Sequence, residues 1–280
     1  MAIDMFNLTT YASVDINYLK EVSPIREDTE GRRLYKYFCN LPYGDVMWKP
    51  HKFGTATNER MPFTKVDINP KYFKNYKMFQ ASLFGLFSES ENISLNSFHV
   101  SRIDLNSDIE NFPMDVVLAH LYVMGYSRDS VSIIRGSTIY IGSNPKIRIY
   151  DKIKEIQSRL RKGKDDITEC DLEMYSSGKQ ITRFEIQIRG YKGTLKNIVD
   201  DPVGLVSYFD RLQFYDMKDD EKIASMGGLQ RLMSRIPRKY RVEYESFKNK
   251  GIEAQIRNNY VSSVKEWFEG KDDGLDGVPF

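Results

Sequence analysis

The stretch from Gly136 to Glu155 constrains the fold more than any other part of the chain. Two alternating segments, Ser137–Ile141 and Lys146–Tyr150, flank a Gly-Ser-Asn-Pro turn. In the second segment isoleucines alternate strictly with Lys146, Arg148 and Tyr150, so one face is apolar and the other is polar. The stretch therefore predicts a β-hairpin, and the apolar spacing after it predicts a helix.

The polar face of this hairpin carries a tyrosine between two cations, because Arg148 and Lys152 flank Tyr150. Cations hold a phosphodiester and lower the free-energy cost of forming a phenolate, so Tyr150 is a candidate nucleophile. Tyr140, on the facing strand, shares this surface by alternation and is the rival nucleophile. The chain has 18 tyrosines, so the preference for Tyr150 rests on the adjacent cations.

Two further segments alternate in the same way, Phe98–Asn106 and Ile181–Arg189. Their polar faces carry Arg102 with Asp104 and Arg183 with Glu185. If the three strands are neighbours in one antiparallel sheet, these groups converge on one surface. A solvated sheet face produces the same alternation and is the alternative interpretation. Carboxylates combined with a phosphate are the usual ligands of Mg²⁺ or Mn²⁺.

The remaining pattern predicts an α+β fold with a mainly antiparallel sheet, helices packed on one face, and a helical C-terminal region. Further strands are expected within residues 3–22 and at Leu34–Asn40, Val46–Lys49 and Phe63–Ile68, and helices at 72–88, Met114–Met124, Ile153–Leu160 and from Leu195 onward. We expect residues 1–195 to form the principal domain, 196–270 a helical region packed on it, and 271–280 a flexible tail.

Composition indicates the class of protein and the cellular compartment to expect. With 41% hydrophobic and 29% charged residues the chain is typical of a globular protein, and its net charge of +2 neither favours nor excludes nucleic acid. Two cysteines give no disulfide framework, so we expect a reducing cytoplasm. No apolar run reaches the length of a membrane span, so no membrane partner is expected.

Three blocks in order resemble the rolling-circle replication initiators of filamentous phages and of small Gram-positive plasmids. They are S-R-I-D, then G-S-T-I-Y-I-G-S with I-R-I-Y-D-K-I-K-E, and finally I-T-R-F-E-I-Q-I-R. Together they cover Ser101 to Arg189, and the opening Ile3-Asp4-Met5 also resembles the phage start. Each block alone is weak evidence for the resemblance, whereas three blocks in this order are fairly specific to the family.

The resemblance implies a metal-dependent DNA nickase and strand transferase, a tyrosine endonuclease that cuts and rejoins one strand at a replication origin through a 5′-phosphotyrosine. It makes Tyr150 the nucleophile and Lys152 the family's lysine, with Asp104, Glu185 and Glu155 as acidic positions that hold Mg²⁺ or Mn²⁺. The implied partners are origin DNA, single-stranded, supercoiled or in a hairpin, and a host helicase and polymerase in the bacterial cytoplasm. A phage or a plasmid could encode such a protein.

Phosphate contacts are assigned from the residues themselves. Arg102, Arg148 and Arg183 lie on the polar faces, and Arg238, Lys239 and Arg241 lie in a basic cluster near the C-terminus. A second basic cluster contains Lys154, Arg159, Arg161 and Lys162. Such clusters follow phosphates, or are ordinary solvated helix faces. Trp48 and Tyr43 could stack on unpaired bases, or pack in the core.

Two alternatives remain open, a non-catalytic origin-binding protein and a conjugative or transposon relaxase. The better-known nicking enzymes hold their metal with two histidines flanking one bulky residue. His51, His99 and His120 are the only histidines here, and they do not form that pair. Alternation places His99 on the face opposite Asp104, so it is expected in or near the core rather than at the metal.

Overall fold

A single antiparallel sheet of ten strands forms the centre of the protein. The computed structural model describes residues 2–31, 34–53, 60–88, 90, 92–123, 131–134, 137–164, 167–214 and 251–270. The strand order is β2-β3-β4-β5-β1-β6-β11-β10-β9-β8, and every pairing is antiparallel. Together with the helices this confirms the predicted α+β class.

The strands of this sheet are β1 (Ile3–Thr10), β2 (Ile25–Glu27), β3 (Tyr37–Leu41), β4 (Gly44–Phe53), β5 (Arg60–Ile68), β6 (His99–Glu110), β8 (Val131–Ile134), β9 (Thr138–Ile141), β10 (Lys146–Asp151) and β11 (Ile181–Arg189). The helices are α1 (Ile16–Val22), α2 (Tyr76–Gly85), α3 (Met114–His120), α4 (Lys152–Arg161), α5 (Glu169–Ser176), α6 (Leu195–Asp200) and α10 (Ile252–Glu269), with 3₁₀ turns η1 (Pro70–Tyr72), η2 (Leu95–Ser97) and η4 (Gly204–Arg211). A separate two-stranded sheet pairs β7 (Leu121–Val123) with β12 (Leu212–Phe214).

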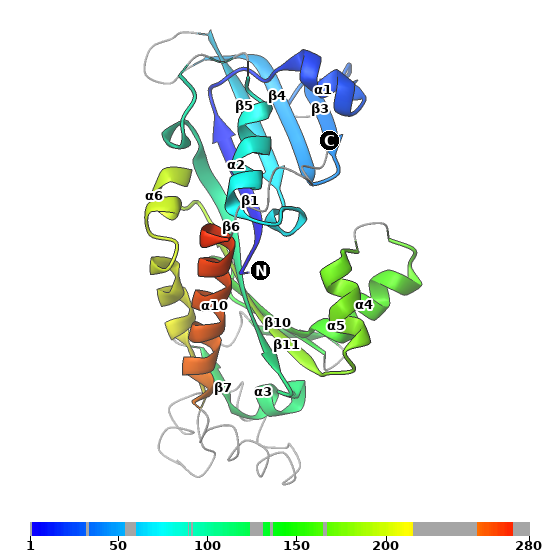
Figure 1. Ribbon diagram of the computed structural model, residues 1–280, viewed down its shortest axis with the longest axis vertical. Coiled ribbons are helices and arrows are strands. Elements are labelled where there is room, and N and C mark those ends of the chain that lie inside the picture. The colour runs from blue at the N-terminus through cyan, green and yellow to red at the C-terminus, as the bar shows by residue number, and fades with distance from the viewer. Residues whose placement is uncertain are drawn as a thin grey trace.

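The core lies between one face of the sheet and the helices α2 and α10, which run along it (Figure 1). Phe6, Ile103 and Phe184 point into this layer from three neighbouring strands and are fully buried. From the helical side Phe79 and Trp267 pack edge to face, with ring centroids 5.5 Å apart. Because successive strand residues alternate between faces, burying these apolar side chains directs the polar ones to the opposite face.

The C-terminal helix α10 shares this core with the sheet. Ile256, Tyr260 and Val264 are buried in the same apolar cluster as the strands. The Ser107 hydroxyl of β6 donates a hydrogen bond of 2.7 Å to the carbonyl of Ile256. Helix α10 (Ile252–Glu269) therefore packs directly on the sheet.

The predicted hairpin is confirmed, with strand β9 facing β10 across Gly142–Pro145. Gly142 adopts a positive φ of 70°, which suits glycine because it has no Cβ. The Asn144 side chain ties the turn to β11, since it donates to the Arg189 carbonyl and accepts from the Arg189 amide, both at 2.9 Å. The strand predicted at Ile181–Arg189 has those bounds in the structure.

Two predicted elements are wrong for reasons of capping and pairing. Residues 16–22 form α1 rather than strand, because the Asp15 carboxylate accepts a hydrogen bond from the Tyr18 amide and caps a helix there. The helix predicted over Met114–Met124 ends at His120. Its last residues, Leu121–Val123, pair with β12 instead, and this long-range pairing overrides their helical spacing.

Several other boundaries differ from the pattern. The strand predicted at Leu34–Asn40 is β3, which begins at Tyr37. The stretch Leu205–Phe214 is a 3₁₀ turn followed by β12, and α5 was not predicted. Residues 215–250 of the expected helical region, which include Arg238, Lys239 and Arg241, and the tail 271–280 lie outside the described residues. Of the helices described, none has both the length and the apolar character that crossing a bilayer requires.

Gly44 occupies a position where no larger residue fits. A Cβ built there would lie 1.9 Å from the carbonyl oxygen of Asp67 on β5. We expect Gly44→Ala to push β4 away from β5 and to lower the free energy of unfolding by about 1–3 kcal/mol, as overpacking does. Urea denaturation measures the change.

The matched control is Gly85→Ala at the end of α2, where a Cβ meets nothing within 4 Å. Alanine favours the helix over glycine by roughly 0.5–1 kcal/mol, so this variant should be slightly more stable than the parent. Equal stability of the two variants would contradict the steric account of Gly44.

Candidate functional site

The polar faces of β6, β11 and β10 meet, as the alternation predicted, because β11 lies between the other two strands. Arg148 of β10 stands opposite Glu185 of β11, and Gln187 of β11 stands opposite Asp104 of β6. These strands, together with β1, η1, α4 and α5, line a cavity of about 380 Å³. The structure therefore brings the sequence-predicted residues of three separate blocks to one concave site.

Tyr150 is at the wall of this cavity, and its hydroxyl donates a hydrogen bond of 3.2 Å to Glu185 Oε2. The Arg148 guanidinium lies over the Tyr150 ring, 3.9 Å from its centre, and also contacts Glu185 Oε2 at 3.4 Å. Only 4% of Tyr150 is exposed, so the phenol is held by its neighbours rather than by solvent. This places an oxygen nucleophile, a carboxylate and a cation in contact.

Burial determines which protonation states of Tyr150 and Glu185 are favoured. Burial raises the pKa of Tyr150 well above its ordinary value, and the opposing charges of Arg183 and Arg148 do not offset it. Arg148 thus lowers the free-energy cost of a phenolate, as expected, but burial outweighs this effect. Burial also raises the pKa of Glu185 to about 7, with the nearby negative charges of Asp4 and Asp104 acting in the same direction. Near neutral pH Glu185 can thus exchange a proton.

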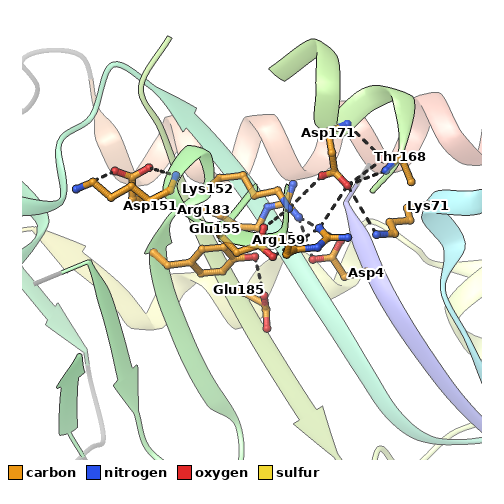
Figure 2. A network of polar contacts seen from close by, with 12 residues as sticks. Asp4, Lys71, Asp151, Lys152, Glu155, Arg159, Thr168, Asp171, Arg183 and Glu185 are labelled. Atoms are coloured by element: carbon orange, nitrogen blue, oxygen red, sulfur yellow. Dashed lines mark hydrogen bonds and ion pairs between the residues drawn. The ribbon is translucent and has the colours of Figure 1, made fainter. Parts of the chain in front are cut away.

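Lys152 is buried and fixed by two carboxylates. Its Nζ lies 2.9 Å from Glu155 Oε2 and 3.2 Å from Asp171 Oδ1. Asp171 also contacts Arg159 at 3.4 Å and Lys71 at 3.8 Å (Figure 2). The cations lower the pKa of Asp171 to about 2, although its burial alone would raise it. Asp171 thus joins α4 and α5 to the η1 turn of the N-terminal half.

Local sequence explains why α4 and α5 hold these groups. The Asp151 side chain accepts a hydrogen bond of 3.0 Å from the Lys154 amide and caps α4 directly after Tyr150. Thr168 caps α5 in a reciprocal box with Asp171, each side chain accepting from the other's amide at 3.2 Å. The Thr-x-x-Asp signature was therefore visible in the sequence, and it would have predicted both α5 and the position of Asp171.

The other predicted cations face carboxylates. Arg102 binds Asp104 through two guanidinium nitrogens, with Nε 2.7 Å from Oδ1. Arg183 binds Asp108 through two contacts of 2.7 Å and reaches Asp4 at 3.1 Å. Asp4 lines the cavity and was not assigned a role from sequence, although its Ile-Asp-Met context was noted.

The predicted acidic residues do not form one cluster. Asp104 contacts Arg102, Glu185 contacts Tyr150, and Glu155 contacts Lys152 and Arg159. Within the described ranges no three His, Cys, Asp or Glu side chains are grouped so that they could hold a metal ion by themselves.

The remaining candidates divide between site and core. Tyr140 stands opposite Arg148 and so shares the face of Tyr150, as predicted, with the Lys146 ammonium 4.7 Å from its ring centre. Trp48 and Tyr43 are buried in the core, which decides against base stacking. The expectation that His99 is buried is wrong. It is exposed, because a register shift in the β1–β6 pairing turns its neighbour Val100 into the core.

Comparison of the chain with protein-family models, with curated proteins and with solved structures found no match. The resemblance to replication initiators therefore rests on the residues of this chain alone.

We expect Asp171 to stabilise the fold in a pH-dependent way. Its pKa is lowered in the folded state, so its contribution is complete above about pH 4 and is lost as pH falls towards 2. A shift from an ordinary value to about 2 corresponds to about 2 kcal/mol. Asp171→Asn should lower the free energy of unfolding by about this amount at pH 6 and less at pH 3.

Urea denaturation at the two pH values measures the effect. Glu110→Gln is the control, because the Glu110–Lys179 pair is exposed and such pairs contribute little. An equal loss in both variants, or a loss of the same size at both pH values, would contradict the role of Asp171.

Proposed function

We propose that this protein cuts and rejoins one strand of DNA through Tyr150. The observation that carries the proposal is the hydrogen bond from the Tyr150 hydroxyl to Glu185, inside a cavity that also presents Arg148 and Lys152. A nucleophile, a proton acceptor and cations are the groups that phosphodiester transfer requires. The order of the three sequence blocks supports DNA at a replication origin as the substrate.

In the proposed reaction the Tyr150 oxygen attacks phosphorus while Glu185 takes the phenolic proton. A Tyr–O–P bond forms to the phosphate that stays on the 5′ end of the downstream strand, and the bond from phosphorus to O3′ breaks. Glu185 returns the proton to the departing O3′, so the products are a 5′-phosphotyrosine and a free 3′ hydroxyl. Attack by a 3′ hydroxyl on the phosphotyrosine reverses these steps and rejoins the strand.

The cations of the cavity have a separate role. A phosphodiester placed at Tyr150 brings negative charge next to Arg148, whose present partner is Glu185 at 3.4 Å. Once Glu185 is protonated it is a poor partner for a guanidinium, and Arg148 is free to bind a non-bridging phosphate oxygen. Lys152, held by Glu155 and Asp171, supplies fixed positive charge at the same wall.

The resemblance also implies Mg²⁺ or Mn²⁺, and part of the donor set fits such an ion. Asp4, Asp104 and Glu185 line the same cavity, and the charges of Asp4 and Asp104 contribute to the high pKa of Glu185. As the base, Glu185 would not also hold the ion, so Asp4 and Asp104 would hold it together with substrate phosphate, and when bound it would neutralise charge on the phosphate. Glu155 lies between Lys152 and Arg159, so it fits this role less well.

The proposed enzyme acts in the cytoplasm of a bacterial host. The free 3′ hydroxyl that its cut leaves is a primer, so a host polymerase and a helicase are the partners we expect.

Tyr150→Phe removes only the attacking oxygen, so this variant should bind DNA as the parent does and form no covalent adduct. The measurement is a denaturing gel of protein incubated with Mn²⁺ and labelled single-stranded DNA carrying its origin. Tyr140→Phe is the matched comparison on the facing strand and should retain the adduct. The reverse pattern would make Tyr140 the nucleophile, and absence of adduct in the parent with intact binding would favour an origin-binding protein.

The pKa of Glu185, about 7, predicts the pH dependence of nicking. A base must be deprotonated, so the single-turnover rate should rise about tenfold per pH unit below 7 and level off above it. Glu185→Gln should remove this dependence together with most of the activity. The rate is followed from pH 5.5 to 8.5 at subsaturating and at saturating Mn²⁺.

A rise that stays near pH 7 at both Mn²⁺ concentrations is the expected result for a base. A rise that moves to lower pH as Mn²⁺ increases would instead make Glu185 a metal ligand, because metal and proton compete for a ligating carboxylate.

A further inference from the structure

A second cavity, of about 290 Å³, also has Tyr150 in its wall. The first cavity extends from Tyr150 towards β11, β6 and β1, whereas the second extends towards Thr138 of β9 and the outer side of α4. Five residues, Arg148, Tyr150, Glu155, Arg159 and Lys164, line both cavities, so the two adjoin at Tyr150.

The second cavity is lined by fewer carboxylates than the first. Its lining includes five cationic side chains, Arg148, Lys154, Arg159, Lys162 and Lys164, and only two carboxylates. The first cavity is lined by seven cationic side chains and five carboxylates. The second cavity therefore attracts anions, and the first also offers the acids that the proposed reaction needs.

Both carboxylates of the second cavity are already engaged. The Asp151 side chain caps α4 through the Lys154 amide, and its other oxygen lies 3.4 Å from Lys154 Nζ. Glu155 contacts Lys152 at 2.9 Å and Arg159 at 3.5 Å. Among the residues that the structure describes, neither Lys162 nor Lys164 has an ion-pair partner, and both line this cavity.

Two of the five cations, Lys154 and Lys162, lie in a row along α4 rather than around a point. Lys154, Ser158 and Lys162 are spaced by four residues, which stacks them along one side of α4. At 1.5 Å per residue the row is about 12 Å long. Such a row is too long for one small anion and suits successive phosphates of an extended strand.

We propose that this second cavity is a subsite for the single-stranded DNA that continues beyond the phosphate held at Tyr150. The identity of the ligand, DNA, rests on the proposed function. The position of the subsite rests on the charge and geometry of the cavity. Holding the strand on both sides of Tyr150 keeps the two ends of a nick in place, because the end not bonded to the tyrosine has no other anchor. The ends can then be rejoined without diffusing apart.

Lys154→Ala/Lys162→Ala tests the subsite, since both lysines line the second cavity and not the first. The variant is made in a Tyr150→Phe background, and its binding to a fluorescein-labelled thymidine 12-mer is measured by fluorescence anisotropy across a salt series. Removing two phosphate contacts should reduce the slope of log affinity against log salt by about 1.4 and weaken binding roughly tenfold at 0.1 M salt. Ser158→Glu, which adds a negative charge to the same row, should also weaken binding.

The matched control is Lys179→Ala/Lys196→Ala. Both lysines are half exposed and ion-paired, and neither lines either cavity. The control should keep the parental slope. An unchanged slope in the test variant, or an equal reduction in the control, would overturn the subsite.

Separate readouts distinguish the two proposals. If the unmodified protein forms no covalent adduct but the test variant loses its salt slope, the subsite stands without the nickase. An adduct that forms while the slope stays constant leaves the nickase and removes the subsite.

Discussion

The position of β11 between β6 and β10 is the constraint on which the rest of the site depends. Three segments far apart in the sequence become neighbours through this pairing, and their register fixes which side chains meet. A shift of one residue in either pairing would turn Glu185 into the core and Phe184 into the cavity. The buried apolar face, continuous with α2 and α10, makes such a shift costly, and the geometry of the polar face follows from it.

Electrostatics in the cavity then follow from burial. Tyr150 and Glu185 share a hydrogen bond in a region with little solvent, so both neutral forms are favoured and both pKa values rise. Asp171 behaves in the opposite way, because Lys152, Lys71 and Arg159 surround it and keep it ionised. Glu185 is thereby ready to exchange a proton, while Asp171 holds α4 and α5 in place against the N-terminal half.

Several features of the site could be predicted from the sequence of each strand taken separately. Strict alternation assigned Arg148, Tyr150 and Glu185 to polar faces. Side chains alternate between faces every second residue whichever strands pair with the segment, so this assignment needs only the local sequence. Where local pattern and long-range pairing disagree, prediction failed. Leu121–Val123 has helical spacing and still pairs with β12, and Val100 turns into the core because a register shift interrupts β6. Asp171 was missed for another reason, since its capping box with Thr168 was present in the sequence and was not used.

The sequence by itself determined the class of fold, the hairpin before α4, and the set of polar residues that strands would present together. Those follow from alternation, turn residues and caps, which act over a few neighbouring positions. Only the tertiary structure decided that Glu185 accepts the hydrogen bond of Tyr150, that Asp171 holds Lys152, and that two adjoining cavities meet at the tyrosine. These depend on strand order, register and burial, which arise when distant segments pack and which no local pattern specifies.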